Sequence, residues 1–282
     1  MKIFVQPDEM RDWSRQQRAN GLSTGCVPTM GALHEGHVSL IEVALRDCDR
    51  VIVTVFVNSL QFNNPDDYFN YPQLMDADTQ ICRDLGVDAL YCPSPQTMYP
   101  SGFETHVLPG PISFPLEGVC RPDHFTGVAT VVTKLFNATQ PDRAYFGLKD
   151  IQQLAVIERM VTDFDLGIKI ISVPTVRQPD GLALSSRNDR LTSDQKDKAS
   201  MIYRGLQAAN ESFKNGERMS SALKSIANEV YAKIPEARIE YIEIFEAHNF
   251  IPIAEIGVNR SIMAVAVWFG DVRLIDNIEF AM

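Results

Sequence analysis

The sequence predicts an α/β fold, with a doubly wound parallel β-sheet followed by a smaller C-terminal α+β domain. The chain has 282 residues, enough for about two domains. Apolar, β-rich runs alternate with helical patterns through the first two thirds, as in a parallel sheet covered by helices on both faces. After Arg187 the pattern changes to helices followed by strands. A second, differently built domain is therefore expected.

The first domain is expected to contain six strands and five helices. The predicted strands are Lys2–Val5, Thr24–Val27, Val51–Val57, Ala89–Cys92, Ala144–Phe146 and Lys169–Val173. The predicted helices are Asp8–Ala19, His37–Asp47, Asp76–Leu85, Thr126–Asn137 and Ile151–Phe164. Ligands of such sheets lie at the carboxyl ends of the strands, near the switch in strand order. The functional residues are therefore expected directly after strands.

The remaining segments complete the expected organisation. Residues Tyr99–Pro122 are rich in proline and glycine, and an ordered loop of this length is usually a functional flap. The second domain is expected to have two exposed helices, Ser193–Asn215, opened by a Ser-Asp cap signal, and Ser220–Lys233. Its antiparallel strands are expected at Arg238–Phe245, Ser261–Phe269 and Val272–Asn277, with Gly270-Asp271 as a tight turn. The boundary near Val173–Arg177 divides the chain into residues 1–175 and 176–282.

Composition excludes several classes of function. Hydrophobic content of 45% and charged content of 22% are ordinary for a globular protein, and no apolar run approaches the ~20 residues of a membrane span. The N-terminus lacks the apolar core of a signal peptide. The five cysteines form no C-x-x-C pair, which favours reduced thiols in the cytoplasm. A net charge of −10 argues against nucleic-acid binding, because phosphate neutralisation needs a basic face.

The most informative motif is the segment Thr29–His37, T-M-G-A-L-H-E-G-H. It joins a short strand to a helix through a glycine-bearing loop, where backbone N–H groups and the helix dipole attract anions. His34 and His37 are three residues apart and share one side of the first helical turn. A zinc pair is the alternative, but the zinc helix motif needs histidines four apart. We interpret the segment as a nucleotide-activating site.

Of two further motifs, one follows a predicted strand and the other directly precedes the predicted helix Thr126–Asn137. Asn58 and Gln61 follow the most hydrophobic strand, and their side-chain amides can bind hydroxyls or carboxylates. The alternative is that they are polar residues that end the strand and cap the next element. In Arg121-Pro122-Asp123-His124-Phe125, Asp123 is a candidate helix N-cap.

The segment Phe146–Gln153 also joins a strand to a helix. Gly147 allows close backbone approach, and Lys149 supplies positive charge for phosphate, with a solvated lysine as the alternative. Asp150 is a candidate for capping the helix or for helping to hold Mg²⁺. Gln153 is expected on the first helical turn, near the strand ends.

The last motif runs from Pro174 to Arg177 and from Asp180 to Asn188. The hydroxyls of Ser185 and Ser186 and the guanidinium of Arg187 suit the oxygens of a polyphosphate. Its place near the domain junction indicates a mobile clamp over nucleotide. A polar turn between domains is the alternative.

Taken together, these motifs resemble the pantothenate synthetase family, also called pantoate–β-alanine ligases, from end to end. The blocks that carry the resemblance are Pro28–His37, Phe56–Phe62, His124–Phe125, Phe146–Gln153 and Pro174–Asn188. The H-x-G-H element is shared with the wider nucleotidyltransferase superfamily. The resemblance implies a Rossmann-like fold and ATP-dependent condensation of (R)-pantoate with β-alanine. It also implies a pantoyl-adenylate intermediate and release of AMP and pyrophosphate.

The resemblance assigns roles to individual residues. The ATP-binding set is Met30, Gly31, Ala32, Leu33, His34, Glu35, Gly36, His37, Gly147, Leu148, Lys149, Asp150, Val176, Leu184, Ser185, Ser186 and Arg187. Gln61 and Gln153 match the pantoate-binding residues, and Gln61 would also border β-alanine. His37, His34 and Lys149 are the expected catalytic groups. His37 matches the family's proton donor, whereas phosphoryl chemistry favours both histidines as hydrogen-bond donors.

The resemblance also implies Mg²⁺ as cofactor, a homodimer and a cytoplasmic enzyme. The metal ligands are not evident, and Asp78 is a candidate only by its position. Four residues depart from the family pattern, namely Ser59, Gln73, Leu148 and Leu184. They put rate and nucleotide affinity in doubt more than the type of reaction. The rival functions are a cytidylyl- or adenylyltransferase and a non-catalytic tRNA- or protein-binding relative of the synthetases.

Overall fold

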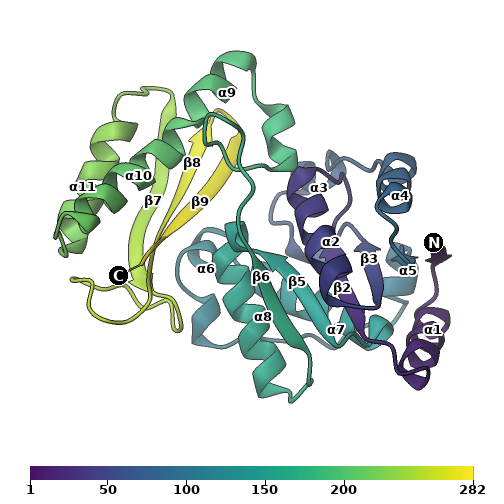
Figure 1. Cartoon of the computed structure of the whole chain (residues 1–282). Helices are drawn as coiled ribbons and strands as arrows, with labels where there is room; N and C mark the ends of the chain where they lie inside the picture. The colour runs from purple at the N-terminus through teal and green to yellow at the C-terminus, as the bar shows by residue number, and fades with distance from the viewer. Residues whose placement is uncertain (282) are drawn as a thin grey trace. The chain divides into compact units, whose positions relative to one another are not determined.

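The computed structural model describes residues 1–281 of the chain, which form two compact units (Figure 1). The first unit contains Met1–Leu148 and Val156–Pro174, and the second contains Lys149–Ala155 and the residues from Thr175 onward. Each unit has its own sheet. Within residues 1–281, every helix is too short or too polar to cross a lipid bilayer.

The first unit is built on a parallel sheet of six strands in the order β1-β4-β3-β2-β5-β6. The strands are β1 (Lys2–Phe4), β2 (Thr24–Thr29), β3 (Arg50–Val55), β4 (Ala89–Tyr91), β5 (Arg143–Gly147) and β6 (Lys169–Val173). From β2 the chain first adds β3 and β4 on one side, and later adds β5 and β6 on the other. The switch in strand order therefore lies between the carboxyl ends of β2 and β5, where ligands of such sheets bind. The predicted α/β class is confirmed.

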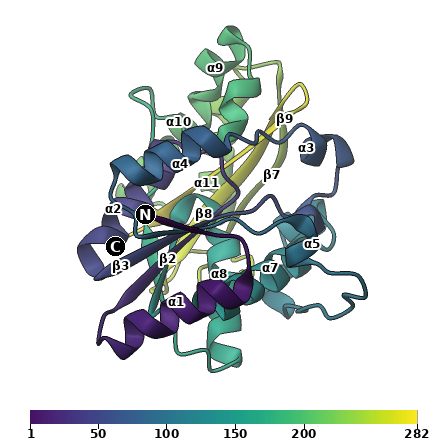
Figure 2. The ribbon, with the colours of Figure 1, turned by 90° about the vertical axis from the view of Figure 1, so that its right-hand side faces the viewer.

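Helices cover both faces of this sheet (Figure 2). On one face, α2 (Glu35–Asp47) and α4 (Met75–Asp84) pack Leu40, Ile41 and Cys82 on the valines of β2 and β3. On the other face lie α1 (Pro7–Ala19), α7 (His124–Thr139) and the later turns of α8 (Ile151–Asp163). Nearly all side chains of β2 and β3 are buried, as expected for strands covered on both faces.

Several boundaries differ from the predicted ones. Helix α2 begins at Glu35, two residues earlier than expected, because His34 caps it. Helix α7 begins at His124, and Asp123 occupies the N-cap position in a left-handed conformation without a capping side-chain bond. The segment Tyr99–Pro122 is irregular as predicted, apart from two short helical turns. Those two turns are η2 (Pro111–Ser113) and α6 (Glu117–Cys120). The other short elements are η1 (Ser59–Gln61), α3 (Pro65–Phe69), α5 (Pro95–Met98), η3 (Leu148–Asp150) and η4 (Ser186–Arg190).

The second unit contains an antiparallel sheet of β7 (Ala237–Glu246), β8 (Ser261–Phe269) and β9 (Val272–Phe280). Its helices are α9 (Ser193–Ala199), α10 (Met201–Lys214) and α11 (Ser220–Tyr231). The prediction of one exposed helix over Ser193–Asn215 is wrong in two respects. The helix is interrupted at Ser200, and α10 buries Leu206 and Phe213 in the core of this unit. Amphipathic helices that cover one face of a sheet bury their apolar stripe.

Candidate active site

The loop after β2 is held in place by a buried carboxylate. Asp78 on α4 is 1% exposed and accepts hydrogen bonds from the N–H of Ala32 (2.9 Å) and of Leu33 (2.7 Å). Gly31 has a φ of +82°, and a Cβ atom there would lie 2.9 Å from the same carboxylate. The conformation of the loop is therefore set by α4, a helix more than forty residues away in the sequence.

His34 and His37 lie together at the start of α2. The Nδ1 atom of His34 accepts a hydrogen bond from the Gly36 N–H (3.1 Å), and Nδ1 of His37 accepts from the His34 N–H (3.3 Å). The ring centroids are 4.2 Å apart. Because both Nδ1 atoms act as acceptors, the proton of each neutral ring is on Nε2. Each imidazole can therefore donate a hydrogen bond through Nε2 at the positive end of the helix.

The side chain of Gln61 is oriented by its neighbours in the first unit. Asn58, which is 1% exposed, donates from Nδ2 to the Gly127 carbonyl (3.0 Å) and to Gln61 Oε1 (2.9 Å). Tyr99 donates to Asn58 Oδ1 (2.6 Å), and Gln61 Nε2 donates to the sulfur of Met30 (3.1 Å). The Gly127 carbonyl can only accept, so it sets the orientation of both amides. Gln61 thus presents N–H groups on the side of Met30, which begins the loop before the histidines.

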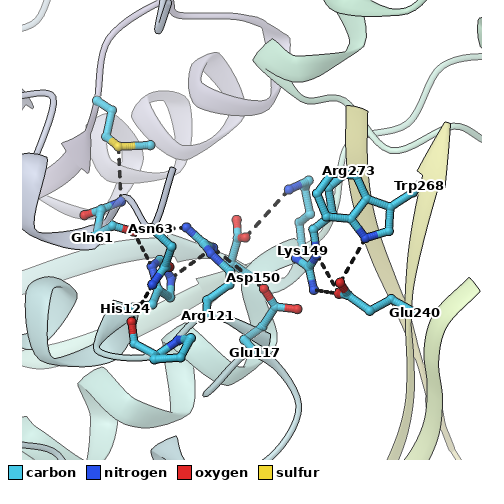
Figure 3. A network of polar contacts seen from close by, with 12 residues as sticks. Gln61, Asn63, Glu117, Arg121, His124, Lys149, Asp150, Glu240, Trp268 and Arg273 are labelled. Carbon is cyan, nitrogen blue, oxygen red and sulfur yellow. Dashed lines mark hydrogen bonds and ion pairs between the residues drawn. The ribbon is translucent and has the colours of Figure 1, made fainter. Parts of the chain in front are cut away.

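The backbone of Gln61 is held as well (Figure 3). Its carbonyl accepts from Nδ1 of His124 (2.8 Å) and from the guanidinium of Arg121 (3.1 Å). Arg121 also donates to Nε2 of His124 (3.2 Å) and lies 3.7 Å from the carboxylate of Glu117. A guanidinium cannot accept, so His124 is the tautomer with its proton on Nδ1.

In the second unit, Lys149 lies in the turn η3, directly before α8. Its Nζ is 3.6 Å from Asp150 Oδ1 (Figure 3). Its backbone carbonyl accepts a hydrogen bond from Asn277 Nδ2 (3.0 Å). The Lys149 side chain is 19% exposed and that of Asp150 is 47% exposed. Gln152 is buried, whereas Gln153, the predicted pantoate ligand, is only half-buried on the first turn of α8.

The first part of the predicted polyphosphate motif forms a tight β-hairpin in the second unit. The N–H of Leu184 donates to the carbonyl of Val176 (3.0 Å), which pairs two residues of the predicted ATP-binding set. Gly181 turns the hairpin with a φ of +99°. Ser185 Oγ then caps η4 by accepting from the N–H of Arg187 (3.3 Å). The hairpin therefore leads directly into the Ser185–Arg187 turn.

Within each unit, the structure brings several predicted site residues together. In the first, Met30 lies beside Gln61, and His34 lies beside His37. Gly147 ends β5, which pairs with β2 across the switch in strand order. Gln153 lies in the second unit. That it shares a site with Gln61 stays a prediction.

Sequence reasoning missed the residues that hold these groups. The sequence leaves the Mg²⁺ ligands open and makes Asp78 a candidate only by its position, whereas both oxygens of Asp78 accept backbone N–H groups of the loop. Its role as a metal ligand stays untested. Asp276 and Asn277 received no role, although a polar pair within an apolar strand is a signal that a buried contact needs them. Tyr99 and Gly127 gave no such signal, because their contacts join distant segments.

Two further observations on residues 1–281 concern clustered metal-ligating side chains and the cysteine thiols. No group of three or more His, Cys, Asp or Glu side chains there could hold a metal ion. All five cysteines are free. Burial raises the pKa of Cys26 and of Cys82 to about 12, so these thiols are poor nucleophiles.

Comparison with known proteins gives one consistent result. The profile of the family described as "Pantoate-beta-alanine ligase" matches residues 2–279. The chain is 43% identical over 279 residues to "Pantothenate synthetase" of Syntrophomonas wolfei and 45% identical over 282 residues to that of Rhodopirellula baltica, with 99% of each chain covered. It resembles the crystal structure of pantothenate synthetase from Thermus thermophilus with a TM-score of 0.94 and 41% identity, covering 100% of both chains.

A second solved structure is similar at a TM-score of 0.81 and 39% identity, covering 99% of this chain and 97% of the other. It is the pantoate-beta-alanine ligase from Francisella tularensis, described as complexed with beta-gamma ATP and beta-alanine.

Proposed function

The chain belongs to the pantoate–β-alanine ligase family and is a ligase, and from this premise we propose that it works through a pantoyl adenylate. In the proposed reaction, ATP, (R)-pantoate and β-alanine give pantothenate, AMP and pyrophosphate. The relative complexed with an ATP compound and β-alanine supports two of the three substrates.

The observation that carries this proposal is the tautomer of the two histidines at the switch in strand order. In the first step, a pantoate carboxylate oxygen attacks the α-phosphorus of ATP, and the bond to pyrophosphate breaks. The Nε2–H groups of His34 and His37 donate to the phosphoryl oxygens, on which negative charge develops. The helix N-terminus adds to this stabilisation. This step needs hydrogen-bond donors, so neither ring has to be an imidazolium.

In the second step, the uncharged amine of β-alanine attacks the acyl carbon of the adenylate. The C–O bond to AMP breaks, and the nitrogen releases its extra proton to solvent. Gln61 and Gln153 are proposed to hold pantoate, and Gln61 to border β-alanine. The contacts of Gln61 support a donor role, because its Oε1 already accepts from Asn58.

The triphosphate is proposed to contact Lys149, Ser185, Ser186 and Arg187, as well as the backbone of the loop before α2. Mg²⁺ would neutralise phosphate charge when it enters with ATP. It usually keeps several waters and takes only one or two carboxylates, so the half-exposed Asp150 fits this need. We also propose residues 1–175 as the nucleotide- and pantoate-binding domain, residues 176–282 as a lid, a homodimer and a cytoplasmic location.

The decisive experiment follows the nucleotide. With ATP, Mg²⁺ and pantoate but no β-alanine, we expect exchange of labelled pyrophosphate into ATP. Multiple-turnover release of AMP should require β-alanine as well. ADP as product would contradict an adenylate and indicate an acyl phosphate. Pyrophosphate release without free AMP would favour the nucleotidyltransferase alternative.

A further inference from the structure

Two adjacent residues of β9, Asp276 and Asn277, contact two segments to which the proposed function assigns ATP binding. Val272, Leu274 and Phe280 of this strand are buried in the core of the second unit, and Asp276 shares their face. Adjacent residues of a strand point to opposite faces, so the two polar side chains contact different parts of the unit. A buried acid in an apolar strand needs a specific partner.

That partner is Arg177, in the first strand of the Val176–Leu184 hairpin. Its guanidinium forms two hydrogen bonds with Asp276, of 2.6 and 2.9 Å. It also donates to the carbonyl of Gly181 (3.2 Å). Its Cζ atom lies over the ring of Tyr203, 3.7 Å from the ring centroid. Asp276 is 2% exposed. A bidentate pair in a buried position has one favourable geometry, so it orients the hairpin on the sheet.

The orientation of the hairpin bears directly on the proposed phosphate contacts. Arg177 lies next to Val176, whose carbonyl pairs with the N–H of Leu184, and Ser185 follows at once. Asn188 Nδ2 donates to the carbonyl of Ala183 (3.0 Å), which ties η4 back to the hairpin. A displacement of Arg177 would therefore move the Ser185–Arg187 turn.

Asn277 makes the corresponding contact with the other segment. Its Nδ2 donates to the backbone carbonyl of Lys149 (3.0 Å) in η3, directly before α8. This bond holds the backbone from which the Lys149 side chain extends. The first turn of α8 is held by the helix itself, so Gln153 depends less on Asn277 than Lys149 does.

We propose that Asp276 and Asn277 are positioning residues for ATP, which set the spacing between Lys149 and the Ser185–Arg187 turn. The inference rests on the proposed function, because that function places phosphate at both segments. It adds the prediction that β9 affects the binding of one substrate and not of the other. Substitution at β9 should affect the use of ATP and leave pantoate binding nearly unchanged.

The test compares Asn277→Ala, Asn277→Asp and Asp276→Asn with a matched control, Glu279→Gln. Glu279 lies on the same face of β9 as Asn277, and its side chain is paired with Arg260. Pantoate-dependent exchange of pyrophosphate into ATP is measured against each substrate, together with the melting temperature. We expect Asn277→Ala to raise KM for ATP roughly five- to tenfold, the size expected for one lost hydrogen bond. KM for pantoate should change by less than about twofold.

The other variants sharpen the result. Asn277→Asp puts an oxygen opposite the Lys149 carbonyl and should be at least as harmful as alanine. Asp276→Asn should raise KM for ATP further. If this variant does not fold, the Asn277 variants still test the inference. Folded Asn277 variants with unchanged ATP constants, or with equal changes for both substrates, would overturn the inference. If the wild-type chain shows no pantoate-dependent exchange, it is the proposed function that fails.

Discussion

At the scale of single residues, His37 has two roles, and a single substitution would remove both at once. Its Nδ1 accepts the N–H of His34 and so helps to cap α2, and its Nε2–H is the proposed donor to phosphate. Loss of a capping interaction costs ~1 kcal/mol of stability. Loss of a donor to transition-state charge costs about 10²–10³ in rate. The two effects differ enough to be measured separately.

We therefore predict that His37→Ala slows adenylate formation by roughly 10²–10³. His37→Asn should be equally slow but more stable, because the Asn oxygen can still accept the backbone N–H. Single-turnover formation of the adenylate and thermal unfolding are the two measurements. His248→Ala, which changes a largely exposed histidine, is the matched control. Adenylation at the wild-type rate in His37→Ala would remove this residue from the mechanism.

At the scale of elements, the helix α4 fixes the conformation of the loop after β2. The loop carries non-glycine Ala32 at a φ of +50°, which is an unfavourable conformation. The two hydrogen bonds to Asp78 offset this strain. The position of the loop that precedes His34 and His37 is thus set from α4.

Asp78→Asn tests this coupling. The amide group would present N–H to one of the two backbone N–H groups, which leaves a buried donor unsatisfied and costs about 1–3 kcal/mol. We expect lower stability to chemical unfolding and weaker ATP binding. Asp76→Asn, an exposed acid on the same helix, is the control. A change in the dependence on Mg²⁺ concentration, with ATP binding at saturating Mg²⁺ intact, would instead support Asp78 as a metal ligand.

At the scale of the whole molecule, nucleotide binding should stabilise the fold. The proposed ATP contacts come from residues far apart in the sequence, from Met30 to Arg187, and unfolding removes all of them. A ligand that binds only the folded chain at about 100 times its Kd adds about 2.7 kcal/mol of stability.

We expect ATP with Mg²⁺ to raise the melting temperature by several degrees, and CTP to raise it much less. Differential scanning fluorimetry over a range of nucleotide concentrations provides the measurement. Equal stabilisation by CTP would point to general phosphate binding and would favour the nucleotidyltransferase alternative.

How much of this protein was predictable differs between elements and sites. The six strands and the order of the motifs follow from local patterns, because apolar runs and glycine-bearing turns depend on nearby residues. The start of α2 differed from the prediction, because the His34 side chain accepts a hydrogen bond that ordinary capping rules do not assign to histidine. The helix break at Ser200 was likewise hidden within a continuous helical pattern.

The sequence by itself determined the fold class, the family and the residue types available for chemistry. Only the tertiary structure decided which ring nitrogen of each histidine carries the proton and which way the Gln61 amide faces. It alone also showed that Asp78 holds the loop after β2. It also showed that Asp276 and Asn277 reach Arg177 and Lys149, about one hundred residues or more away in the chain. Local patterns reflect interactions over a few residues. Hydrogen-bond direction, in contrast, depends on partners that meet only after the strands have paired.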